Sequence, residues 1–146
     1  MEKLLLVFSN WIFVISVREA LIQGDLVAAF LVANSGIAST VHHIIEERFG
    51  FKPLIKIKSD NIRWLVLQWD RIAPLLAAYY LFDESFFREQ FVPIIGLISA
   101  MIISDVVCWT TLISRPVQLQ VRTILHTIWH AGAFYIAYLL VLFRSV

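Results

Sequence analysis

The chain has 146 residues, of which 60% are hydrophobic and 16% are charged, and its formal net charge is +1. The charged fraction is well below the roughly 25% of soluble domains, and the mean hydropathy of +0.79 indicates an integral membrane protein. The single cysteine, Cys108, excludes an intrachain disulfide framework and a cysteine-rich zinc ribbon. The basic residues lie in short loops rather than in a stripe with aromatics, which argues against nucleic-acid binding.

Apolar segments of about 20 residues, each long enough to cross a bilayer, follow one another along the chain. They run over about Leu4–Ile22, Leu26–Ile45, Ile62–Phe82, Phe91–Ile113 and Thr123–Phe143. No small-residue cleavage site follows the first segment, so we interpret it as a retained span rather than a signal peptide. The connections are short and contain no repeat or interdomain linker. The sequence therefore predicts an all-α fold, a single polytopic transmembrane helical bundle over residues 1–146 with about five spans.

The basic residues predict the orientation of this bundle. The N-terminal side carries Lys3, Arg48, Lys52, Lys56, Lys58, Arg63, Arg115 and Arg122. The opposite side carries only Arg18, Arg88 and Arg144. Because Lys and Arg accumulate in cytoplasmic loops, we expect the N-terminus in the cytoplasm and the C-terminus outside.

Polar residues in three of the predicted spans lie at a similar depth. His43 is about one turn from the inner end of the second segment, and Ser39 lies one turn deeper on the same face. Asp70 is about two turns into the third segment, and His126 and His130 are one and two turns into the last. Ionisable residues inside spans are costly and mark function or buried pairing. These side chains are predicted to converge within the inner leaflet.

Their chemistry fits a metal-dependent hydrolase. Three histidines, His43, His126 and His130, suit tetrahedral zinc with a fourth position open for water, the arrangement of catalytic sites. Zinc lowers the pKa of such water toward neutrality, and Asp70 is predicted to take its proton as general base. Ser39 is predicted to donate a hydrogen bond to the oxyanion. The residues predict cleavage of an amide or ester bond, and a site opening within the bilayer favours a membrane lipid as substrate.

Neighbouring residues offer alternatives at two of these positions. His42 is a rival ligand, but it points about 100° away from His43 around the helix, and the Ser39 spacing favours His43. Glu46 and Glu47 could each orient an imidazole by hydrogen bonding. We interpret both glutamates instead as the start of a solvated loop.

Asp70 has a competitor in Asp105 of the fourth segment, which lies at a similar depth. Arg71, inside the third segment, needs an acidic partner because a lone charge within the membrane is costly. We assign Asp105 to Arg71 and Asp70 to the site. Adjacent helix residues diverge by about 100°, so a direct pair between Asp70 and Arg71 is not expected.

The motifs together resemble the CREST superfamily of membrane hydrolases, which includes the alkaline ceramidases and the adiponectin and progestin receptors. They are SxxxH from Ser39 to His43, the carboxylate Asp70 in WDRIAPLL, and HxxxH from His126 to His130 in HTIWH. The resemblance implies three zinc-binding histidines beside an Asp and a Ser, and hydrolysis of a ceramide-like lipid or a phospholipid. Family members typically have seven spans. A bundle of five implies a more open site or completion by homo-oligomerisation.

Two other functions use the same residues differently. A b-type haem protein for electron transfer would take axial histidines from the second and fifth spans, but it leaves Ser39 and Asp70 unused. A catalytically silent receptor or scaffold protein would keep zinc as a structural element. A di-iron lipid hydroxylase is disfavoured because the chain's 4 histidines are too few for its histidine clusters.

Overall fold

The computed structural model describes residues 2–46, 53–109 and 114–144, apart from the side chains of residues 2, 3, 104, 105 and 107–109. Its elements are α1 (Glu2–Asn10), α2 (Phe13–Ile22), α3 (Leu26–Ile45), α4 (Asp60–Leu81), α5 (Glu84–Glu89), α6 (Phe91–Trp109) and α7 (Arg115–Phe143). All of the regular structure in these ranges is helical. The predicted all-α fold is confirmed.

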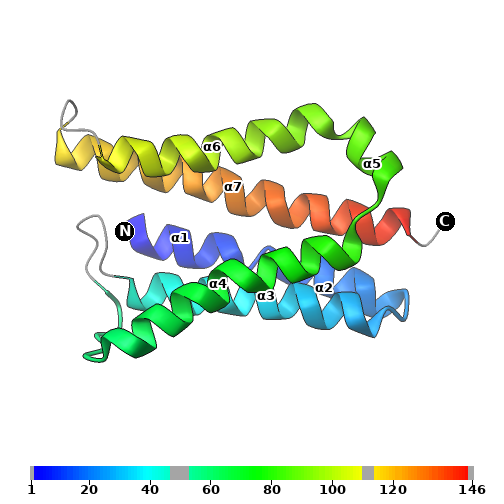
Figure 1. Cartoon of the computed structure of the whole chain (residues 1–146), viewed down its shortest axis with the longest axis horizontal. Coiled ribbons are helices and arrows are strands. Elements are labelled where there is room, and N and C mark those ends of the chain that lie inside the picture. The colour runs from blue at the N-terminus through cyan, green and yellow to red at the C-terminus, as the bar shows by residue number, and fades with distance from the viewer. Residues whose placement is uncertain (1, 47–52, 110–113, 145–146) are drawn as a thin grey trace.

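The helices run back and forth along one long axis (Figure 1). α1 and α2 continue one another, and α3, α4, α6 and α7 then alternate in direction, so that α1 begins and α7 ends at opposite ends of the bundle. Among the described residues, Leu4–Ile22, Leu26–Ile45 and Arg115–Phe143 are long and apolar enough to cross a membrane. The apolar stretch in α6 is shorter, Phe91–Ile103. Five spans, and the orientation of the termini, stay predictions.

We expected the first predicted span to be one continuous helix. It consists instead of two helices separated by a turn at Trp11 and Ile12. The side chains of Ser9 and Asn10 both donate to the carbonyl of Leu6, over 2.8 and 3.2 Å. Such local bonds compete with the regular helical ladder. The Trp11 amide accordingly bonds the carbonyl three residues back, at Phe8.

Helix ends account for the other differences from the predicted segments. α7 begins two turns before the predicted Thr123 because a proline occupies its first turn, after Ser114 at the N-cap position. α5 forms within the predicted DESFFREQ connection, where the Asp83 carboxylate accepts the Phe86 amide at 2.8 Å. That hydrogen bond lowers the pKa of Asp83. α3 has the predicted bounds, with Gly24 at φ +76° in the turn before it and Asp25 as its N-cap.

α1 and α2 pack against both α3 and α7, the two helices that carry the histidines. Close contact between α2 and α3 depends on Gly36, where an added Cβ would lie 2.1 Å from the Phe13 ring. The buried apolar cluster beside this contact joins α2, α3, α4 and α7, and comprises Phe13, Ala20, Ala28, Ala29, Val32, Leu81, Phe134 and Val141. This packing fixes α3 relative to α7 and so positions the polar residues near the α3 C-terminus.

Candidate metal centre

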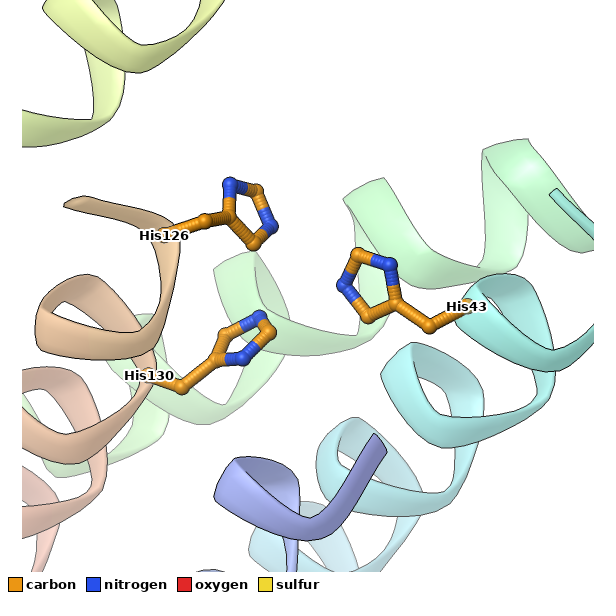
Figure 2. Close-up of side chains that lie close together, drawn as sticks. All are labelled: His43, His126 and His130. Atoms are coloured by element: carbon orange, nitrogen blue, oxygen red, sulfur yellow. The ribbon is translucent and has the colours of Figure 1, made fainter. Parts of the chain in front are cut away.

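The structure brings the three predicted ligands together. His43 lies in the last turn of α3, and His126 and His130 lie one turn apart on α7. Figure 2 shows the three rings grouped around one point. The ring centroids are 5.0 Å apart for His43 and His126, 5.1 Å for His43 and His130, and 4.6 Å for His126 and His130. His43 and His130 are buried, and His126 is half-buried.

The donor atoms of this cluster fit a metal ion. One nitrogen from each ring lies within 4.8 Å of the others. Tetrahedral zinc with bonds of about 2.0–2.1 Å brings its ligand nitrogens to about 3.3 Å from one another, so small rotations of the rings would close the site. His43 Nε2 and His126 Nδ1 are buried and have no hydrogen-bond partner among the described residues. A buried polar atom without a partner costs about 1–3 kcal/mol, and metal ligation would remove that cost.

Ser39 lies inside the candidate site, as its spacing from His43 predicts. Its side chain is buried, and its Oγ is 3.4 Å from His130 Nε2. The hydroxyl therefore borders the nitrogens that would bind a metal.

Asp70 reaches the site at its edge. It is half-buried on α4, and its Oδ2 lies 4.0 Å from His42 Nε2. The His42 ring centroid is 5.3 Å from that of His43. The structure therefore places Asp70 beside His42, with His42 next to a candidate ligand.

The expected pair between Arg71 and Asp105 lies outside the described residues because the side chain of Asp105 is not described. Arg71 itself is exposed on α4. Of the two aspartates that compete for a place at the metal site, Asp70 is the one whose side chain is described, and it contacts His42.

The interpretation of Glu46 as the start of a solvated loop is wrong. Its side chain is buried at the C-terminal end of α3, where one carboxylate oxygen accepts His43 Nδ1–H at 3.2 Å. The other oxygen accepts from Arg122 of α7 at 3.0 Å and lies 3.9 Å from His42 Nε2. The i+4 spacing would pair Glu46 with His42. At the end of the helix, however, Glu46 forms its hydrogen bond with His43, three residues before it. Glu47 lies outside the described residues.

This network keeps Glu46 ionised. Burial alone would raise the pKa of its carboxyl, but the hydrogen bond from His43 and the charge of Arg122 outweigh burial and lower that pKa to about 2. A carboxylate held in this way is a weak base. Its chemical role is to accept hydrogen bonds.

Two residues at the site were missed by the sequence analysis. Arg122, expected in an inner loop, is buried on α7. Its spacing of four residues from His126, and of eight from His130, puts all three on one helix face and was a usable signal. Ser9 of α1, whose Oγ lies 2.9 Å from His130 Nδ1, had no such signal because only the tertiary fold brings it there.

His42, His43 and Glu46 also have donor atoms within 4.8 Å of one another. That group shares His43 with the first cluster, and its carboxylate is already engaged by Arg122. The three-histidine cluster is therefore the better metal site. In comparisons with known proteins, no family model, curated protein or solved structure matches the chain.

Proposed function

We propose that this protein is a zinc-dependent membrane hydrolase that cleaves an amide or ester bond of an acyl lipid. The observation that carries the proposal is the cluster of His43, His126 and His130, in which two of the rings have a buried nitrogen without a hydrogen-bond partner in the described part of the chain. The bundle around it has helices apolar and long enough to cross a membrane. Three neutral imidazoles with an open fourth position are the ligand set of catalytic zinc.

Bound zinc would supply Lewis acidity and a water molecule of lowered pKa. The residues around it would supply the remaining chemistry. Asp70 is the carboxylate suited to proton transfer, since Glu46 is held by His43 and Arg122 and its pKa is about 2. His42 lies between Asp70 and His43, on the path by which a proton would leave.

Ser39 would stabilise the negative charge that forms on the carbonyl oxygen of the substrate. Its Oγ borders His130 Nε2, so a carbonyl that enters the cluster comes within reach of the hydroxyl. Hydrogen-bond donors aimed at a developing oxyanion typically contribute a factor of about 10²–10³ to the rate.

The position of the site supports a lipid substrate. His43 lies in the last turn of α3, at the end of a stretch apolar enough to cross a membrane. The amide or ester bond of an acyl lipid lies at the same boundary, between the acyl chains and the headgroup. Membership of the CREST superfamily is part of this proposal, and it names ceramide-like lipids and phospholipids as the substrates to test.

The competing functions use less of the structure. Two axial histidines would serve a haem, which leaves the third ring of the cluster and Ser39 without a role. A silent zinc-containing receptor or scaffold would need the three histidines but not Asp70, and this difference can be measured.

The first test is metal analysis by inductively coupled plasma mass spectrometry on detergent-purified protein, with an absorption spectrum of the same samples. We expect about one zinc per chain in the wild type, loss of zinc in His130→Ala, and retention in the matched control His42→Ala. A chelator should lower the unfolding temperature of the wild type and not that of His130→Ala. A Soret band, or a wild type without metal, would contradict the proposal.

The second test separates an enzyme from a silent protein. Asp70→Ala and Ser39→Ala should retain zinc and lose release of fatty acid from ceramides or phospholipids by about 10²-fold or more. Unchanged turnover in both variants would remove these residues from the mechanism. If no lipid is cleaved by a wild type that holds zinc, the scaffold function would take its place.

A further inference from the structure

We propose that Glu46 and Ser9 are positioning residues that fix His43 and His130 as Nε2 ligands before any metal binds. The inference rests on the proposed metal site and adds the hydrogen bonds that prepare it. A neutral imidazole carries its proton on either Nδ1 or Nε2, and only the other nitrogen can bind a metal. The partner of one nitrogen therefore decides which atom is the ligand.

For His43 the deciding partner is Glu46. An ionised carboxylate only accepts hydrogen bonds, so the nitrogen 3.2 Å from Glu46 Oε2, Nδ1, must carry the proton. The lone pair is then on Nε2. That atom is the buried nitrogen without a hydrogen-bond partner among the described residues.

For His130 the deciding partner is Ser9. A hydroxyl has one hydrogen to donate, and the Ser9 hydroxyl donates it to the Leu6 carbonyl at 2.8 Å. Ser9 Oγ can therefore only accept from His130 Nδ1, at 2.9 Å. The His130 lone pair is again on Nε2, the nitrogen beside Ser39.

Arg122 extends the arrangement to a second helix. Glu46 belongs to the end of α3, and Arg122 of α7 donates to its other oxygen at 3.0 Å. The carboxylate is thus held from one side by the arginine while it orients His43 on the other. Although α3 and α7 carry all three ligands, the hydrogen bond that Ser9 accepts from His130 makes α1 part of the site.

A purely structural role would not require this pattern. Two chemically different acceptors, a carboxylate on α3 and a hydroxyl on α1, leave the same nitrogen free on two different rings. Partners of this kind typically contribute a factor of about 10–100 to metal affinity. We expect the same range here.

The test compares Ser9→Ala with Ser16→Ala. Ser16 is a matched control because its buried hydroxyl also joins the N-terminal segment to α7, by donating to the Phe134 carbonyl at 2.8 Å, and the bond involves no histidine. Ser9→Ala loses two buried hydrogen bonds, to Leu6 and to His130, and Ser16→Ala loses one, so both variants should have a lower unfolding temperature and Ser9→Ala the lower of the two. Only Ser9→Ala should lower zinc affinity, by about 10-fold or more, in competition with a chromophoric chelator.

Nitrogen-15 NMR of histidine-labelled, metal-free protein in micelles provides a readout that a loss of stability would not move. We expect His43 and His130 in the wild type and in Ser16→Ala to be protonated at Nδ1. In Ser9→Ala, His130 should shift to the Nε2–H tautomer, because Ser39 then provides the remaining acceptor. An Nε2–H tautomer of His130 in the wild type would overturn the inference.

A second pair of variants tests Glu46. Glu46→Ala should lower zinc affinity by about 10–100-fold, while Glu46→Gln, whose amide oxygen still accepts from His43 Nδ1, should retain more of it. Wild-type affinity in both Ser9→Ala and Glu46→Ala would overturn this inference and leave the proposed function standing. A wild type that binds no zinc would overturn the proposed function and this inference with it, whatever the tautomers are.

Discussion

The two ends of the bundle differ in whether their polar side chains have partners within the chain. At one end, Asp25, Tyr80 and Arg144 form what we call the latch, which joins the start of α3 to the ends of α4 and α7. One Asp25 oxygen accepts the Ala28 amide at 2.9 Å and the Tyr80 hydroxyl at 3.0 Å, and Arg144 lies 3.8 Å from the other. Arg144 also covers the Tyr80 ring at 4.5 Å and donates to the Tyr80 carbonyl at 3.0 Å.

At the other end, the histidine cluster leaves His43 Nε2 and His126 Nδ1 buried without hydrogen-bond partners among the described residues. Polar groups that bond one another within the chain stabilise a fold. Buried nitrogens that lack a hydrogen-bond partner call for another explanation, such as a bound ligand. The latch therefore contributes to stability, whereas the histidine cluster could hold a metal ion.

The largest effect is expected from acid at the histidine end. The pKa of Glu46 is lowered from 4.5 to about 2 in the folded protein. Its ionised form therefore stabilises the fold above the unfolded-state value, and that stability is lost as the pH falls from 4.5 toward 2. At about 1.4 kcal/mol per pH unit, the loss is about 3 kcal/mol.

Unfolding by sodium dodecyl sulfate, followed by circular dichroism on metal-free protein from pH 6 downward, would measure this acid dependence. Glu46→Gln is the matched control because it has no proton to gain, and the difference between the two curves isolates Glu46 from the histidines. Parallel curves for the wild type and Glu46→Gln would show that folding does not lower the pKa of Glu46.

A smaller loss is expected at the latch. Asp25→Ala removes the N-cap of α3 together with the partners of Tyr80 and Arg144. Loss of an N-cap costs about 1–2 kcal/mol, so the same unfolding assay should show at least that decrease. Zinc stoichiometry should remain at the wild-type value because the latch lies at the opposite end of α3 from His43.

Asp83→Ala provides the control for this variant. Asp83 caps the short helix α5 through the Phe86 amide, so its replacement removes a cap without touching the latch. Asp83→Ala should therefore cost less than Asp25→Ala. Loss of zinc from Asp25→Ala would mean that the two ends are coupled and would break the comparison.

The sequence predicts the features of this fold that depend on local patterns. The bounds of α3 follow from Asp25 before it and from a continuous apolar run, both visible in the sequence. The spacing of His126 and His130 places both rings on one face of α7, so the convergence of the three histidines could be anticipated from helix geometry and depth.

Features that depend on tertiary partners were not predictable in the same way. Glu46 was expected at the start of a solvated loop and Arg122 in an inner loop, yet each is buried with the other as its partner, and the sequence does not show that pairing. Similarly, Ser9 comes from a helix more than a hundred residues from His130. Asp70 was predicted at the right depth, but its contact with His42 depends on the rotation of α4.

The smallest effect should come from Tyr80→Phe, which removes one hydroxyl from the latch and keeps the ring beneath Arg144. Asp25 still accepts the Ala28 amide, so the carboxylate is not left without a partner and the loss should be about 1 kcal/mol or less. Tyr79→Phe is the matched control, because Tyr79 is 86% exposed and the change should leave stability within about 0.5 kcal/mol of the wild type. Equal unfolding midpoints for Tyr80→Phe and Tyr79→Phe would show that Arg144, through its charge and its contact with the ring, holds the latch without the hydroxyl. The latch would then be an ionic contact, and raising the salt concentration should weaken it.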